Sequence, residues 1–168
     1  MIRRGLTLVE MVLVLSLTGV LAAVSVGGFV GFTDWRAATG LKRLADDIRF
    51  ARQAAIIAGV RTAWVFDAAR QSYELRREPD VASGAFGGAV LPHALTGGDW
   101  RVALAEIGAG PIVRVQGTTA NTVVFGSDGL PRNVAGQRVG NNVVIRLIAG
   151  GRVVIERRTG VVRMEPGG

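Results

Sequence analysis

The chain has 168 residues, with 20 basic and 13 acidic side chains, a formal charge of +7 and no cysteine. The lack of cysteine excludes a disulfide framework, thiol nucleophiles and thiolate metal ligands. Apart from Lys42 every basic residue is arginine, a side chain that binds phosphates or carboxylates in a bidentate manner but more often forms a solvated face.

The first 32 residues combine a basic leader with a long apolar run. The leader carries Arg3 and Arg4 and ends at Gly5, and the run over residues 6–32 contains one charge, Glu10. A carboxylate in hydrocarbon costs roughly 2.5–3.5 kcal/mol, so such a residue usually has a partner and a function. As a helix, residues 11–32 would extend about 33 Å, enough to span a membrane.

Three simpler interpretations of this segment explain less. A secretory signal could be cleaved near residues 23–25, but Glu10 interrupts its apolar core and the run continues past Ser25. Two arginines alone are weak evidence for a twin-arginine signal. A plain anchor fits the length but leaves Glu10 unexplained. Arg3 and Arg4 favour a cytoplasmic amino terminus, although the far flank also carries Arg36, Lys42 and Arg43.

The next segment predicts an amphipathic helix that ends at Gly59. Residues 35–58 lack proline, and Gly40 is their only glycine. Apolar residues recur at the spacing of one helix face, namely Leu41, Leu44, Ile48, Ala51, Ala55 and Ile56. We assign the other face to Arg36, Lys42, Arg43, Asp46, Asp47, Arg49, Arg52 and Gln53.

After Gly59 the pattern changes to period two, which predicts strands. A hairpin is expected over residues 62–66 and 71–76, and a long loop over residues 78–98, which contain two prolines and five glycines. Further strands are expected at residues 99–107, 112–116, 122–125, 142–148, 152–157 and 161–165. The prediction is an α+β fold: a long N-terminal helix, with a transmembrane half (6–32) and an amphipathic half (33–59), packed on an all-β domain of seven or eight antiparallel strands (60–168).

The residues offer little for catalysis, metal or cofactor binding. His93 is the only histidine and stands in the expected loop, where a solvated side chain is the usual case. Residues 108–110 have two glycines of a dinucleotide fingerprint but lack the third. Asp128 and Gly129 resemble part of a calcium loop but indicate a tight turn. We therefore predict that the protein is not an enzyme and binds no metal and no cofactor. We expect Trp64, Trp100 and Phe125 to lie in the core or at an interface.

The N-terminal pattern resembles the class III signal of type IV pilins and type II secretion pseudopilins. The matching residues are Arg4 and Gly5, then residues 6–10, then the apolar stretch to residue 24. The resemblance implies that a prepilin peptidase cleaves between Gly5 and Leu6 and methylates Leu6. It also implies that Glu10 faces the amino terminus of a neighbouring subunit during assembly. Two departures are Leu6, where phenylalanine is commonest, and the absence of the usual proline near residues 27–28.

The remainder of the chain resembles the GspH/FimT group of minor pilins and pseudopilins. The matching segments are residues 124–131, 142–148 and 158–163. The resemblance implies a minor pseudopilin near the tip of the type II secretion pseudopilus. Its implied partners are the prepilin peptidase, the other minor and major pseudopilins and the bacterial inner membrane, crossed once with the β domain in the periplasm.

The alternative function is that of a minor type IV pilin of the FimT type, in pilus assembly or in DNA binding and uptake. Some members of that group resemble DNA receptors with a C-terminal Gly-Arg-x-Arg pattern. Here Gly160 and Arg163 match, but Val161 replaces the first arginine. A basic patch for DNA or for a partner is expected from Arg152, Arg157, Arg158 and Arg163. We favour secretion over DNA uptake.

Overall fold

The structure, a computed structural model, describes residues 8–78, 88–93, 95–148, 150–165 and 167, with the backbone alone for residues 23–34. The chain divides into two units, Met1–Trp35 and Arg36–Gly168. Helix α1, Leu8–Ala58, contributes to both. Within the described part of the chain, no helix is both long enough and apolar enough to cross a membrane.

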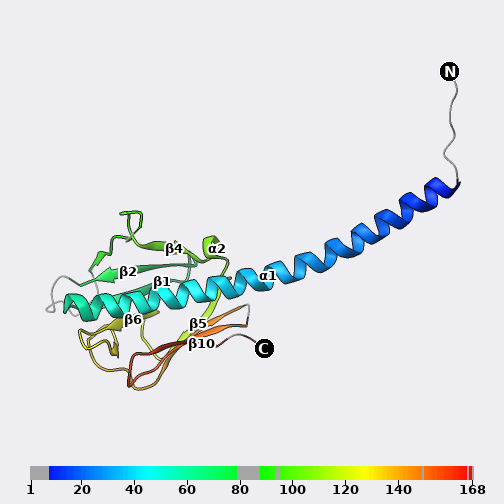
Figure 1. Cartoon of the computed structure of the whole chain (residues 1–168). Helices are drawn as coiled ribbons and strands as arrows, with labels where there is room; N and C mark the ends of the chain where they lie inside the picture. Colours follow the sequence, from blue (N-terminus) through cyan, green and yellow to red (C-terminus); the bar gives the residue numbers. More distant parts are fainter. Residues whose placement is uncertain (1–7, 79–87, 94, 149, 166, 168) are drawn as a thin grey trace. The chain divides into compact units, whose positions relative to one another are not determined.

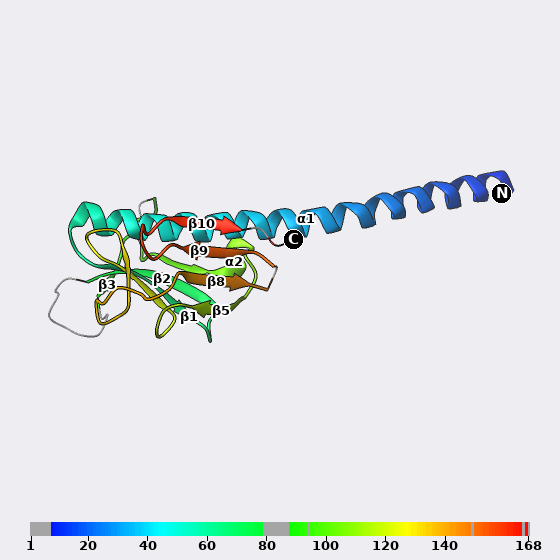
Figure 2. The same cartoon turned by 90° about the horizontal axis from the view of Figure 1, so that it is seen from below.

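The second unit contains two antiparallel sheets beside the C-terminal half of α1 (Figures 1 and 2). In the first, the strand order is β3-β2-β1-β6-β7, and β4 also pairs with β2. Its strands are β1 (Thr62–Asp67), β2 (Ser72–Arg77), β3 (Ala89–Val90), β4 (Arg101–Ala103), β6 (Thr122–Phe125) and β7 (Pro131–Arg132). The second has the order β10-β9-β8-β5, formed by β5 (Ile112–Gln116), β8 (Val143–Leu147), β9 (Arg152–Ile155) and β10 (Val162–Glu165).

The α+β fold and the β1–β2 hairpin are confirmed. The strand predicted over residues 99–107 is wrong in its second half, because β4 ends at Ala103 and a one-turn helix, α2 (Leu104–Ile107), follows. Gly108 ends α2 in the left-handed conformation, at φ 70°. The described residues form ten strands rather than seven or eight, since β3 and β7 are two-residue strands with no detectable period.

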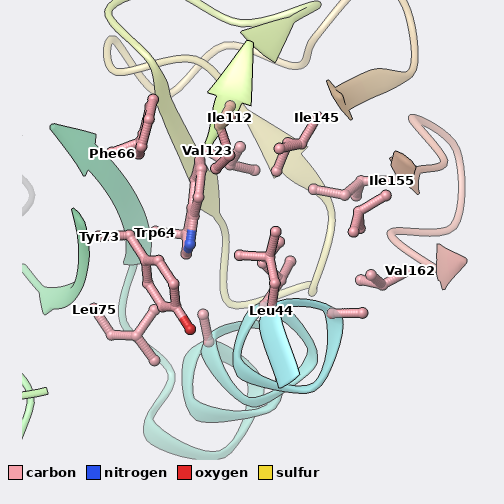
Figure 3. Close-up of a cluster of buried hydrophobic side chains, with 14 of the residues drawn as sticks. Leu44, Trp64, Phe66, Tyr73, Leu75, Ile112, Val123, Ile145, Ile155 and Val162 are labelled. Carbon is pink, nitrogen blue, oxygen red and sulfur yellow. The ribbon is translucent and has the colours of Figure 1, made fainter. Parts of the chain in front are cut away.

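The core lies between α1 and the inner faces of both sheets. Figure 3 shows Leu44 of α1 between Tyr73 and Leu75 on one side and Ile155 and Val162 on the other. All five side chains are at most 5% exposed. The apolar face predicted for α1 is therefore the one that packs, except that Ile56 is 44% exposed. Burial of Trp64, Trp100 and Phe125 is confirmed.

Asp47 corrects the predicted polar face, because its side chain is buried. It is 4% exposed and accepts hydrogen bonds from the Tyr73 hydroxyl at 2.6 Å, the Trp100 indole at 3.4 Å and Arg43 Nε at 3.2 Å. Burial, and next the charge and hydrogen bond of Asp47, raise the pKa of Tyr73 well above its usual range, so the phenol keeps its proton. A carboxylate with three donors can be buried at acceptable cost, which helical period alone does not reveal.

Gly40 lets the loop after α2 approach the helix. A Cβ added to Gly40 would lie 2.3 Å from the backbone nitrogen of Ala109 and 2.7 Å from the carbonyl carbon of Gly108. Two helix residues predicted on the polar face reach β10 and the turn between β6 and β7. Arg49 donates to the carbonyl of Val162 at 3.0 Å, and Arg52 donates to that of Gly129 at 3.1 Å.

Residues 79–87 and 94 of the predicted long loop lie outside the described residues. The described part contains β3, which pairs with β2, and an isolated bridge between Pro92 and Asp99. This segment therefore has more regular structure than its proline and glycine content predicts.

Candidate functional site

The N-terminal candidate site is described only in part. Gly5 and Leu6, where cleavage and methylation are expected, lie outside the described residues. Glu10 stands in the first turn of α1 with an exposed side chain, where a carboxylate complements the helix dipole. The structure thus places the carboxylate near the start of the helix.

The helical surface around Glu10 is almost wholly apolar and exposed. The large apolar residues there are each 54–81% exposed: Leu8, Val9, Met11, Val12, Leu13, Val14, Leu15, Leu17, Val20 and Leu21. Soluble monomers rarely expose so large a contiguous apolar patch, and such patches mark contacts with lipid or protein. The Ser16 and Thr18 hydroxyls donate to the carbonyls of Val12 and Val14, at 2.8 and 2.7 Å, so both are satisfied within the helix.

The C-terminal arginines lie at two places in the second sheet. Arg152 and Arg163 extend from the outward face of neighbouring strands, where Arg152 pairs with Glu165 and Arg163 with Glu156, the latter at 2.9 Å. Both are therefore partly neutralised.

Arg157 and Arg158 stand in the turn that follows β9. The guanidinium of Arg157 donates to the carbonyl of Gly140 at 2.7 Å, while Arg158 is exposed. Arg152 and Arg163 thus lie on β9 and β10, and Arg157 and Arg158 lie in the turn between these strands.

Two arginines that were not predicted from the sequence lie beside Arg152 in the second sheet. Arg114 on β5 is opposite Arg146 on β8, and Arg146 is opposite Arg152 on β9. Their outward positions in period-two strands were visible in the sequence. The register that aligns them across three strands was not, because it depends on which strands pair.

The side chains of His93 and Asp128 both contact neighbouring residues of the fold. The His93 ring packs on Trp100 with centroids 4.5 Å apart, and its Nε2 is 3.3 Å from the guanidinium of Arg43. Partial burial alone would raise the pKa of Asp128, but hydrogen bonds from Leu130 N–H and Arg132, and nearby positive charge, lower it. Among the described residues, no three acidic, histidine or cysteine side chains gather where they could hold a metal ion.

Comparison with known proteins identifies the fold. No protein-family model and no curated protein matches the sequence. Among solved structures, two of the minor pseudopilin EpsH from the type 2 secretion system of Vibrio cholerae match at TM-scores of 0.53 and 0.55, with 13% and 10% identity. The matches cover 78% and 79% of this chain and 97% and 95% of those chains.

A structure of the type IV minor pilin FimU of Pseudomonas aeruginosa matches at a TM-score of 0.47 with 12% identity, over 77% of this chain and 88% of that one. The likeness to EpsH alone carries the conclusion. In both EpsH structures nearly the whole chain is matched, which is a likeness of architecture rather than of one motif. The chain has the type IV pilin-like fold.

Proposed function

We propose that this protein is a minor pseudopilin, a subunit near the tip of the type II secretion pseudopilus that supports protein export across the outer membrane. The observation that carries the proposal is one chain that joins a pilin-like β unit to an exposed apolar helix bearing Glu10. EpsH, whose structure has the same fold, is a minor pseudopilin of a secretion system, which supports the proposal.

We propose that the chain is inserted into the bacterial inner membrane before it assembles. Residues 6–32 would cross it once, with residues 60–168 in the periplasm. The apolar side chains of the first helix turns and the internally bonded Ser16 and Thr18 hydroxyls support a lipid environment. Residues 1–5 would be the leader that the prepilin peptidase removes.

Processing is tested by mass spectrometry of the protein extracted from its native membrane. We expect an N-methylated terminus at Leu6, and an uncut precursor when Gly5 is replaced by a bulky residue. A terminus at Met1, or one near Val26, would contradict the proposal.

Glu10 is proposed to pair with the methylated amino terminus of a neighbouring subunit, either minor or major pseudopilin. Glu10→Ala should still insert into the membrane, because a costly charge is removed from hydrocarbon. It should nevertheless fail to assemble, because the ion pair is lost. Cross-linking to other pseudopilins and secretion of folded substrates measure the effect, with Ser16→Ala as a control in the same helix. Wild-type cross-linking and secretion by Glu10→Ala would refute this role.

The DNA-uptake alternative receives less support from the arginine geometry. Arg152 and Arg163 are paired with Glu165 and Glu156, whose negative charges oppose a phosphate backbone. Binding to duplex DNA should therefore be weak, independent of sequence and lost as salt rises. Firm binding at physiological salt that Arg157→Ala with Arg163→Ala abolishes would instead favour the DNA-binding function.

A further inference from the structure

Three arginines form a row across the outward face of the second sheet. Arg114, Arg146 and Arg152 occupy directly paired positions on β5, β8 and β9, and Glu165 on β10 completes the row. The three strands are neighbours in the sheet (Figure 2). Directly paired residues point to the same face with Cβ atoms about 5 Å apart, so the three guanidinium groups share one surface.

This arrangement is unfavourable unless something neutralises it. Like charges at paired positions destabilise a sheet. Glu165 pairs with Arg152, but Arg114 and Arg146 have no carboxylate within ion-pair distance among the described residues. Two adjacent guanidinium groups thus remain available, each with a planar set of donors suited to a carboxylate.

A hollow adjoins the same row. It has a volume of about 300 Å³ and is lined by Arg146, Arg152 and Glu165 together with backbone at Gly150 and Gly151. A Cβ on Gly151 would lie 2.8 Å from Leu41, so the hairpin here packs closely on α1. The arginine row therefore borders a concave surface on a supported hairpin rather than a flat one.

We propose that Arg114, Arg146 and the adjoining hollow bind an acidic segment of a partner protein, with its carboxylates on the two guanidinium groups. Apolar side chains on the same face favour a protein over a nucleic acid, since Val144 and Val154, the pair next to Arg146 and Arg152 along β8 and β9, are only half-buried. Glu165 and Glu156 are paired with Arg152 and Arg163, so neither carboxylate occupies the guanidinium groups of Arg114 and Arg146. A second copy of this chain is a poor partner because its formal charge is +7. The inference rests on the sheet register and holds whichever filament the protein joins.

The probe is a fluorescein-labelled octapeptide in which glutamate alternates with valine. The test measures its binding to the full chain, which is kept in solution with a non-ionic detergent. Fluorescence anisotropy at low salt gives the affinity. Arg114→Gln with Arg146→Gln should weaken binding about tenfold, and rising salt should weaken it further. Arg70→Gln is the matched control, because Arg70 is an exposed arginine in the β1–β2 turn of the other sheet. Circular dichroism checks that the variants are folded.

Several outcomes would overturn the proposal. Equal binding of a peptide with glutamine in place of glutamate would remove the role of charge. Losses of binding free energy that are equal per charge removed in Arg70→Gln and in the double variant would reduce the effect to net charge. Tighter binding of a DNA duplex or of inorganic phosphate than of the acidic peptide would assign the row to phosphate instead. None of these outcomes depends on membrane insertion or processing, so their result is separable from the proposed function.

Discussion

Asp47 provides the sharpest test of how α1 is held on the first sheet. Tyr73 is 1% exposed, and Asp47→Ala would leave its hydroxyl without the acceptor at 2.6 Å. An unsatisfied buried donor costs about 1–3 kcal/mol, whereas the half-exposed Arg43 recovers water and contributes less than about 1 kcal/mol. The 3.4 Å contact to Trp100 adds little. We expect unfolding free energy to fall by about 2–3 kcal/mol.

Urea unfolding followed by tryptophan fluorescence measures this loss, because Trp64 and Trp100 are buried. At the usual dependence for a domain of this size, the midpoint should fall by roughly 1–2 M. The matched control is Asp46→Ala, since Asp46 is the neighbouring residue but half-exposed and paired with Arg49 at 2.6 Å. Its loss should stay below about 0.5 kcal/mol.

A double-mutant cycle identifies the cause of the loss. Tyr73→Phe removes the donor, so Asp47→Ala should cost less in that background, by about 1 kcal/mol or more. Additive effects would show that Asp47 does not stabilise the fold through Tyr73. A midpoint for Asp47→Ala equal to that of Asp46→Ala would refute the reasoning altogether.

Two further predictions concern Gly40 and Asp128. Alanine normally stabilises a helix by about 1 kcal/mol over glycine. Gly40→Ala should instead lower the unfolding free energy, because its Cβ would lie 2.3 Å from the Ala109 backbone. Gly19→Ala, with open space around it, should not lower the unfolding free energy. Because the pKa of Asp128 is lowered in the folded state, its carboxylate stabilises the fold above about pH 3.9, the pKa of an aspartate in the unfolded chain. This stabilisation is lost as the pH falls through the lowered pKa. Asp128→Asn should therefore destabilise at pH 7 by less than about 1 kcal/mol after solvent screening, and the difference from wild type should vanish in acid. A constant difference across pH, or a stabilised Gly40→Ala in thermal unfolding, would contradict these two accounts.

The candidate sites differ in how far the sequence could predict them. The motif at Gly5, Leu6 and Glu10 is local, so it is legible without any fold, and its function remains a prediction. Arg152 and Arg163 were selected because they are close in sequence, yet each has a carboxylate partner on a paired strand or its extension. Arg114 was missed because 32 residues separate it from its cross-strand neighbour Arg146.

The sequence by itself determined what depends on local period and turn chemistry. Helix α1, the β1–β2 hairpin and the bounds of β5 and β6 follow from apolar spacing and from the glycines that end each run. Only the tertiary structure decided which strands pair, that Asp47 is buried, and that Gly40 must lack a side chain. The reason is physical: period reports which face of an element is apolar, whereas register, buried polar partners and close backbone approach are set by groups far away along the chain.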